Sequence, residues 1–375
     1  MLCGLTEKFV GTKMEIAVLG GGNGSVAAAA DLTLNGHIVK YWRRDKKKIK
    51  ELKAANNIIH LKDFNGVKEV KIPTVSSDIA KVIKGVDLIV CPIPATGQLD
   101  LAKIVVPFLE NNQVVLLPPG SFGSWLFAKS QHHIKKNINV CYAESGTLPY
   151  LARLNGTNTI AITTRATRLP TGVFPQKNKD RALSIIKKAY PSVEDCGDIL
   201  SAALMNAGPI IHPPLIIMNA GPIEHFDYWD IHNEGTQPAI RNVTTALDNE
   251  RIKIRETLGY TSHHFPLADH YDNSREEWMY GNVAHEKLID SGDWREKLIL
   301  KEHRYMREDI EIGLALMVSI AKWANVSTPV AEGLLNLGSS VCEINFSEKG
   351  RSLKNLNIEN YSISQLKEIL DNGFK

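Results

Sequence analysis

Short apolar runs recur along the first half of the chain and are separated by stretches with the composition of helices. Such short, largely apolar runs are typical of strands buried on both faces of a parallel sheet. We predict strands at Met14–Leu19, His37–Trp42, Leu88–Cys91, Gln113–Leu117, Val140–Ala143 and Thr157–Thr164. Helices are predicted at Val26–Leu32, Lys46–Ala55, Leu101–Leu109 and Lys179–Ala189. Strands that alternate with helices predict an α/β fold with a doubly wound parallel sheet.

Helical patterns dominate the chain beyond Gly197. The expected helices are Leu200–Asn206, Ile240–Leu258, Leu298–Ala324 and Ser364–Leu370. We therefore predict two domains, with an α/β domain over residues 1–197 and an all-helical domain over residues 198–375.

A glycine-rich turn joins the first predicted strand to the first predicted helix. Gly20 permits the tight turn, and Gly22 has no Cβ, so a pyrophosphate can approach the backbone. The helix that follows points its free N–H groups and its positive dipole end at the phosphates. Asn23, Gly24 and Ser25 complete the turn, with Ser25 where Gly or Ala is usual. Strand, turn and helix together predict a dinucleotide site on a Rossmann-type domain. The predicted strand Leu88–Cys91 stops at Pro92–Pro94, and we expect this loop, with Pro94, to face the cofactor.

Two arginines, Arg43 and Arg44, follow the second predicted strand, where an acidic residue would favour NAD. A guanidinium fork suits the 2′-phosphate of NADP, so the sequence favours NADP, with NAD as the alternative cofactor. A solvated basic turn that leads into Lys46–Lys48 is the alternative interpretation of the same two residues.

Composition excludes several classes of protein. Hydrophobic content of 43% and charged content of 23% are ordinary for a soluble globular protein, and a net charge of +3 predicts neither nucleic acid nor an anionic membrane as partner. The five cysteines are scattered without metal-ligand spacing, which predicts reduced thiols, a cytoplasmic location and no metal site. We expect Met1–Lys13 to be a loose extension or a misassigned start, without a signal peptide, and no run approaches the length of a membrane span. The sequence is compatible with a homodimer.

Two segments of the helical half carry candidate chemistry. His212 precedes Pro213–Pro214, a pair expected to break or kink the segment, and an imidazole at such a break can move a proton in a cleft between domains. The second segment contains Arg304 and Asp309, which would bind a substrate carboxylate and hold the imidazole of His212, respectively. The residues alone leave a structural histidine and exposed helical ion pairs as alternatives.

The chain resembles the octopine/nopaline (opine) dehydrogenase family. The resemblance rests on short motifs spread in family order, namely 20–24, 144–150, Asn206 with His212–Pro214 and Asn219, 248–251, and Arg304–Tyr305 with Glu308–Asp309. It implies a Rossmann-type domain followed by an all-helical domain, in an enzyme that joins an α-keto acid to the amino group of an amino acid and reduces the imine with a nicotinamide cofactor.

The resemblance also implies roles for single residues. His212 would be the catalytic proton donor and acceptor with Asp309 as its partner, Arg304 would bind a carboxylate, and Glu144 and Asn206 would lie near the amino-acid substrate. The alternatives are an NAD(P)-dependent 2- or 3-hydroxy acid dehydrogenase and a non-catalytic NADP-binding sensor.

Overall fold

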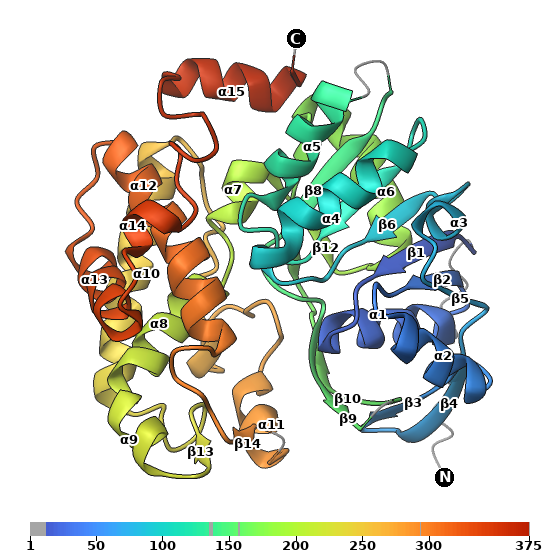
Figure 1. The fold of residues 1–375 in the computed structure, drawn as a ribbon. Helices are drawn as coiled ribbons and strands as arrows, with labels where there is room; N and C mark the ends of the chain where they lie inside the picture. Colours follow the sequence, from blue (N-terminus) through green and yellow to red (C-terminus); the bar gives the residue numbers. More distant parts are fainter. Residues whose placement is uncertain (1–12, 135–137, 157, 293, 375) are drawn as a thin grey trace.

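A computed structural model describes residues 13–134, 138–156, 158–292 and 294–374. The chain forms two lobes, an α/β lobe and a helical lobe (Figure 1). The predicted extension lies outside the described residues except for Lys13, as does Thr157 of the predicted strand at 157–164.

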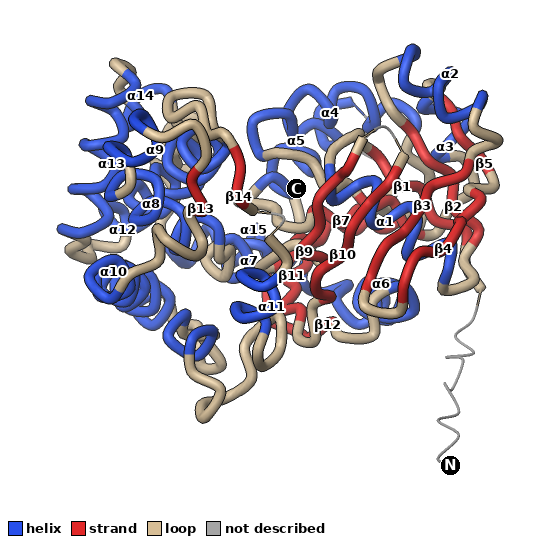
Figure 2. The backbone as a smooth tube through the Cα atoms, turned by 90° about the horizontal axis from the view of Figure 1, so that it is seen from below, coloured by secondary structure: helices blue, strands red, loops and turns tan. Residues whose placement is uncertain are grey.

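An eight-stranded sheet forms the centre of the first lobe (Figure 2). Its strand order is β12-β11-β8-β7-β6-β1-β2-β5, and its pairs are parallel except for β11 with β8. The strands are β1 Glu15–Leu19, β2 Ile38–Trp42, β5 Thr74–Ser76, β6 Leu88–Val90, β7 Val114–Leu117, β8 Cys141–Ser145, β11 Leu169–Phe174 and β12 Val193–Asp198. The expected doubly wound sheet is confirmed, and the first five predicted runs are all strands in it.

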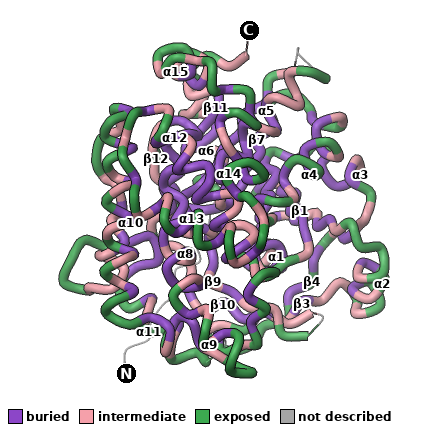
Figure 3. Tube along the Cα trace, turned by 60° about the vertical axis from the view of Figure 1, so that its left-hand side comes forward, coloured by how far each residue is buried: buried purple, intermediate pink, exposed green. Residues whose placement is uncertain are grey.

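Helices cover the sheet, which explains why its central strands are apolar on both faces. They are α1 Asn23–Leu34, α2 Lys46–Ala54, α3 Ile79–Ile83, α4 Gln98–Val105, α5 Gly123–Ile134 and α6 Lys179–Ala189, with 3₁₀ turns η1 Ala95–Gly97, η2 Val106–Phe108 and η3 Gln176–Asn178. Buried positions, drawn in purple, run through the centre of the Cα trace, whereas green, exposed positions lie mainly toward the outside (Figure 3).

A second sheet, of order β4-β3-β10-β9, lies beside α1. Its strands are β3 Ile58–Asp63, β4 Gly66–Lys71, β9 Tyr150–Asn155 and β10 Thr159–Arg165. The Arg165 guanidinium is 2.7 Å from Asp31 of α1 and 2.9 Å from Asp63 of β3, so it ties this sheet to α1. The strand β9 thereby lies close to the glycine-rich turn.

The second lobe is helical except for one two-stranded ladder, β13 Trp229–Asp230 with β14 Arg295–Glu296. Its elements are α7 Ile199–Ala203, α8 Gly208–Met218, α9 Ala220–His225, α10 Pro238–Thr257, η4 Leu267–Tyr271, α11 Ala284–Asp290, the π-helix η5 Tyr305–Leu314, α12 Ala315–Trp323, α13 Pro329–Cys342, α14 Phe346–Lys349 and α15 Ile363–Asn372. The predicted helical character is confirmed.

Two local predictions were wrong. The predicted break does not occur at Pro213 and Pro214, since both lie buried inside the helix α8, which packs against η5 and α10; this packing offsets the lost helix hydrogen bonds. The helix predicted from Leu298 begins only at the π-helix η5, after a turn at residues 300–303.

The chain crosses between the lobes twice. The first crossing follows β12. We propose that the domain boundary lies there, between residues 197 and 198. The second crossing lies near the C-terminus, where α15 returns to the first lobe (Figure 1) and Phe374 lies 4.9 Å from the ring of Trp125. Arg351, on the same returning segment, donates hydrogen bonds to the Ala95 and Ser121 carbonyls.

Within the described residues, the stretch Ile199–Met218 is long and apolar enough to cross a membrane, which corrects the expectation that no run approaches that length. Of its most apolar window, 78% is buried inside the structure, and the stretch is divided between α7 and α8. These are the properties of a core segment.

Candidate active site

A cavity of about 340 Å³ lies where the two lobes meet. The first lobe contributes the glycine-rich turn, the ends of β6 and β7, and β9. The second lobe contributes α8, η5 and the segment between α10 and η5. Ligands of open parallel sheets bind beyond the carboxyl ends of the strands, which is where this cavity lies.

The glycine-rich turn has the geometry of a dinucleotide cradle. Gly20 has a φ of +127°, and a Cβ there would lie 2.3 Å from the Ser25 hydroxyl. Gly22 has open space where a Cβ would lie, and it lines the cavity together with Asn23 and Gly24. This space at the start of α1 fits a pyrophosphate.

The remaining polar residues of the turn hold it in place. The Asn23 side chain accepts a hydrogen bond from the Leu154 N–H of β9 at 3.1 Å. The Ser25 hydroxyl is fully buried, 3.3 Å from the carbonyls of both Leu19 and Pro92, to either of which it donates. Ser25 thus joins the ends of β1 and β6, which explains how a serine fits at the third position of the glycine pattern. Pro94, two residues beyond Pro92, lines the cavity as predicted.

Arg43 lies against the back of the glycine-rich turn. A Cβ added to Gly21 would lie 2.7 Å from Arg43 Nε, and this buried nitrogen has no hydrogen-bond partner among the described residues. Arg44 is exposed. The carboxylate of Asp45, the nearest acidic side chain in sequence, accepts from the Lys47 and Lys48 N–H groups and so caps α2. A guanidinium with an unpaired Nε can bind a phosphate group, whereas a carboxylate already used as a helix cap is not free to bind a ribose diol.

His212 and Asp309 form a close pair inside the cavity. His212 Nδ1, on α8, lies 2.7 Å from Asp309 Oδ2, on η5, and both residues line the cavity. Close approach of the two helices makes this contact, because a Cβ on Gly208 would lie 2.3 Å from Asp309 Oδ1 and one on Gly313 would lie 2.2 Å from Pro209. The predicted contact between the two side chains is confirmed.

The surroundings favour a neutral imidazole. Burial lowers the pKa of His212, and the charges of Arg304 and Arg153 lower it further. Burial raises the pKa of Asp309 to about 7, while Arg304 lowers it. With Nδ1–H directed at Asp309, Nε2 of His212 is the ring nitrogen left to exchange a proton in the cavity.

Arg304 presents a half-exposed guanidinium to the cavity. Its Nε lies 3.9 Å from Glu308 Oε2, while Glu308 Oε1 accepts a hydrogen bond from the Ala95 N–H at 2.9 Å. Glu308 is therefore held by the first lobe, and the guanidinium of Arg304 keeps donors for an anionic ligand.

Asn206 lines the cavity, and its side-chain amide makes hydrogen bonds at the beginning of α8. It donates to the Ser121 hydroxyl at 2.7 Å and accepts from the Gly208 N–H at 3.1 Å. Asn206 thus fixes the start of the helix that carries His212.

Glu144 does not reach the cavity, which corrects the expectation that it contacts the amino-acid substrate. Its side chain is fully buried in β8 and accepts a hydrogen bond from the Phe122 N–H at 2.8 Å. Burial raises its pKa to about 8, opposed by backbone hydrogen bonds and by the charge of Arg351. A Cβ on Gly120 would collide with this carboxyl group, so the turn before α5 closes directly over it.

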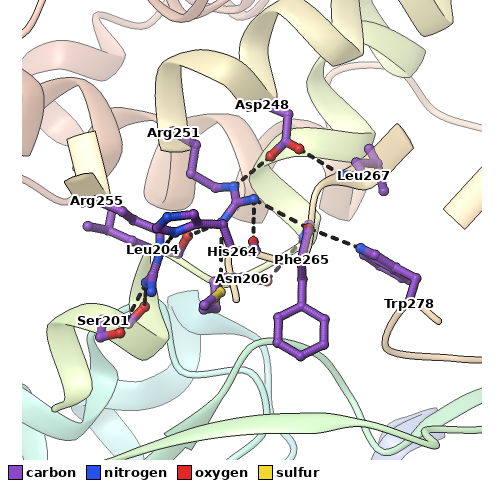
Figure 4. Close-up of polar contacts among 12 residues, drawn as sticks. Ser201, Leu204, Asn206, Asp248, Arg251, Arg255, His264, Phe265, Leu267 and Trp278 are labelled. Carbon is purple, nitrogen blue, oxygen red and sulfur yellow. Dashed lines mark hydrogen bonds and ion pairs between the residues drawn. The ribbon is translucent and has the colours of Figure 1, made fainter. Parts of the chain in front are cut away.

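The matched segment 248–251 is structural. Arg251 donates to Asp248 at 2.6 Å, to the Leu204 carbonyl at 3.0 Å and to the His264 carbonyl at 2.7 Å (Figure 4). The second carboxylate oxygen of Asp248 accepts from the Leu267 N–H at 2.7 Å. This buried network joins the link between α7 and α8 to the beginning of η4, and so positions one wall of the cavity.

Neither Arg153 nor the cavity wall formed by the segment between α10 and η5 was predicted from the sequence. Arg153 projects from β9 into the cavity, where it pairs with Glu296 at 2.8 Å and lies 3.8 Å above the Trp294 ring. The wall comes from the segment between α10 and η5, and its cavity-lining residues are His270, Tyr271, Trp278, Tyr280, His285, Leu288 and Trp294. Their spacing in the sequence has no period or motif that would have marked them.

Comparisons with known proteins match both lobes. Residues 195–342 match the family described as NAD/NADP octopine/nopaline dehydrogenase, alpha-helical domain, and residues 15–135 match the NAD-dependent glycerol-3-phosphate dehydrogenase N-terminus. The chain is 25% identical to an opine dehydrogenase of Arthrobacter sp. (strain 1C), over 95% of this chain and 98% of that protein. It is 24% identical to the vitopine synthase of Allorhizobium ampelinum, over 92% and 95% of the two chains.

Solved structures show the same fold. An octopine dehydrogenase in complex with NADH and agmatine has a TM-score of 0.72 at 16% identity, covering 97% of this chain and 99% of that one. A yersinopine dehydrogenase with NADP⁺ bound has a TM-score of 0.66 at 13% identity, covering 96% and 98%.

The fold and the cavity define a two-domain NAD(P)-dependent dehydrogenase. The resemblance to the octopine/nopaline (opine) dehydrogenase family is supported by the match of residues 195–342 to the helical domain of that family and by the similarity to an opine dehydrogenase along most of the chain.

Proposed function

We propose that this protein catalyses the reversible, NAD(P)H-dependent condensation of an α-keto acid with the amino group of an amino acid. The observation that carries the proposal is the 2.7 Å contact between His212 and Asp309 in a cavity that also holds Arg304 and the glycine-rich turn. A proton-transfer group, a carboxylate binder and a dinucleotide cradle are what this reaction needs in one place.

The proton steps follow from the neutral state of His212. Its Nε2 accepts one proton from the ammonium group of the amino acid, and the freed amine attacks the keto carbon. A second proton passes from the attacking nitrogen to the former carbonyl oxygen, which becomes a hydroxyl group. The imidazolium then returns its proton to this hydroxyl group, which leaves as water while a C=N bond forms. Both hydrogens of that water come from the ammonium nitrogen. A bound reduced nicotinamide supplies the hydride that reduces the C=N bond.

Asp309 controls the charge and orientation of the His212 imidazole, and Arg304 controls the position of the keto acid. Asp309 stabilises the imidazolium while it exists and keeps Nδ1 protonated, so that Nε2 stays directed at the substrate. Arg304 binds the carboxylate of the keto acid and holds its carbonyl beside His212. Asn206 supports both by fixing the start of α8.

The cofactor we propose is NADP, with Arg43 and Arg44 on its 2′-phosphate. The unpaired Nε of Arg43 behind the glycine-rich turn supports this choice, as does the use of Asp45 as a helix cap. We further propose a cytoplasmic enzyme that acts on free small molecules, and a homodimer as its assembly, which light scattering of the purified protein tests.

A substrate matrix tests the reaction. Each of several α-keto acids is mixed with each of several amino acids, and the loss of NADPH or NADH absorbance is followed. We expect oxidation of the cofactor only when both substrates are present, with a secondary amine as product. Oxidation by a keto acid alone would instead identify a hydroxy acid dehydrogenase, and tight NADPH binding without any turnover would identify a sensor.

A further inference from the structure

One end of the cavity is walled by large apolar side chains. We call this part the aromatic chamber and define it by Tyr271, Trp278, Tyr280, Leu288 and Trp294. Four of the five are almost fully buried and Tyr271 is partly buried. All of them come from the segment between α10 and η5, opposite the strand β9 that carries Arg153.

Two histidines that line the cavity beside the chamber, His270 and His285, carry no charge near neutral pH. Burial lowers the pKa of His270 to about 3 and that of His285 to about 4, with the charge of Arg241 as a further cause. Arg241 lies behind the wall, where its guanidinium is 4.5 Å from the ring centre of Tyr271. The surface that a ligand meets in the chamber is therefore aromatic and neutral.

The chamber offers no free carboxylate. Among the described residues that line the cavity, the acidic side chains are Glu308 and Asp309. Asp309 is paired with His212, and Glu308 lies between Arg304 and the Ala95 N–H. Glu144, the carboxylate that sequence analysis placed near the amino acid, lies outside the cavity.

On the β9 side of the chamber, the positive charge is that of Arg153, whose Nη2 pairs with Glu296. Arg153 contacts Glu296 at 2.8 Å and covers one face of Trp294. An anionic side chain would therefore compete with Glu296, and a cationic side chain would lie beside Arg153 without a counter-ion. Burying either charge costs desolvation free energy, and no group of the chamber offsets this cost with an ion pair.

Two buried polar atoms of the wall lack hydrogen-bond partners in the part of the chain that the structure describes, which suggests a ligand or water as their partner. His270 Nδ1 and Trp294 Nε1 have no hydrogen-bond partner among the described residues. Buried polar atoms are nearly always satisfied, so partners supplied by a bound molecule or by water explain this pair.

From these observations we propose that the aromatic chamber holds the side chain of the amino-acid substrate and selects a neutral aromatic one. This inference rests on the proposed function. Aromatic and aliphatic side chains both gain from burial, but aromatic rings also make edge-to-face contacts with Tyr and Trp side chains. The substrate class is thus the aromatic amino acids, in contrast to the L-arginine named in one octopine dehydrogenase structure.

Steady-state kinetics of the unmodified enzyme test the selection. With one keto acid and NADPH at saturation, kcat/KM is measured for phenylalanine, tyrosine, alanine, arginine and glutamate. We expect the aromatic substrates to exceed arginine and glutamate by about 100-fold, as expected when a charged group must enter an apolar site. Arginine, glutamate or alanine as the best substrate would overturn the proposal while leaving the reaction itself in place.

A binding measurement separates this inference from the proposed reaction. The secondary amines formed by reductive condensation of pyruvate with phenylalanine and with arginine are titrated calorimetrically into the enzyme saturated with NADP⁺. Tighter binding of the phenylalanine product, again by about 100-fold, supports the chamber even if no turnover occurs. Equal binding, or tighter binding of the arginine product, overturns it.

A charge introduced into the chamber gives a second test. Leu288→Glu should lower kcat/KM for phenylalanine at least about tenfold and raise that for arginine, whereas the neutral control Leu288→Gln should not raise arginine turnover. If Leu288→Glu fails to fold, which its melting curve shows, the calorimetric comparison on the unmodified enzyme decides. A folded Leu288→Glu variant with unchanged selectivity would contradict the proposal.

Discussion

The imidazole of His212 lies flat against the ring of Tyr305, with 3.6 Å between ring centres and 8° between their planes. The Tyr305 hydroxyl in turn lies 2.7 Å from Nε2 of His232. The stack on Tyr305 and the hydrogen bond to Asp309 together fix the orientation of the His212 imidazole.

Replacement of His212 tests its catalytic role. His212→Ala should lower kcat by about two orders of magnitude, because it removes the group that carries the proton between nitrogen and oxygen. Binding of NADPH, measured by fluorescence, should not change. The matched control is His225→Ala, at an exposed histidine that ends α9, which should retain full activity. Full turnover by the His212 variant would exclude the assigned role.

The pH dependence tests the partnership with Asp309. Neutral His212 is the active form, so kcat/KM should fall as pH drops through the pKa of this imidazole, and burial places that fall below the ordinary value of 6.5. Burial raises the pKa of Asp309 to about 7, so the carboxyl group and the imidazole take up protons in neighbouring pH ranges and titrate as a pair. Asp309→Asn leaves the imidazole to titrate alone, so the fall should move to still lower pH while kcat decreases. Glu311→Gln, on the same π-helix, serves as control. An acid limb that does not move in Asp309→Asn would contradict the pairing.

Arg304→Ala should raise KM for the keto acid about 10- to 100-fold with a smaller effect on kcat, because it removes charge-assisted hydrogen bonds to the carboxylate. The matched control is Arg307→Ala, since Arg307 pairs with Glu311 at 3.0 Å and does not line the cavity. An unchanged KM would show that another group binds the keto acid.

Arg43→Ala should weaken NADPH about tenfold or more and leave NADH nearly unaffected, because only NADPH carries the 2′-phosphate. Lys46→Ala, which removes an exposed charge from the same basic run, separates a specific contact from a general loss of positive potential. Equal weakening of both cofactors would contradict the NADP assignment.

Glu144→Gln should leave KM for the amino acid unchanged, because Glu144 lies outside the cavity. The folded protein keeps this carboxyl protonated up to a pKa of about 8, whereas the unfolded chain releases the proton near 4.5. The folded state therefore binds more protons, and the stability that Glu144 contributes declines as pH rises from about 4.5 to about 8. Denaturation at several pH values should show the unmodified protein losing stability relative to Glu144→Gln over that range. A constant difference would place the pKa of Glu144 at its ordinary value.

The fold was predictable where a single physical requirement dominated the sequence. Strands buried on both faces must be apolar along their length, as in Val114–Leu117, and a turn that admits a pyrophosphate must lack side chains, as at Gly22. The pairing of His212 with Asp309 came from the family resemblance, since nothing in the spacing of residues 97 apart indicates contact.

The rest depended on tertiary packing. The two prolines after His212 predicted a break, but contact of α8 with η5 keeps the helix continuous. Glu144 follows a buried strand like a ligand-binding residue, yet the turn before α5 closes over it. The aromatic chamber and Arg153 are brought together by segments far apart in the sequence, so no local pattern marked either.

The return of the chain at its C-terminus restricts how the two lobes can move. Arg351 anchors the returning segment to the Ala95 and Ser121 carbonyls, beside the loops that border the cavity, and Phe374 packs on Trp125 farther along. Together with the hydrogen bonds that Glu308 and Asn206 make to the first lobe, these contacts attach the helical lobe at several points besides the link after β12. Cutting the chain ahead of residue 350 would leave that link as the covalent connection between the two lobes.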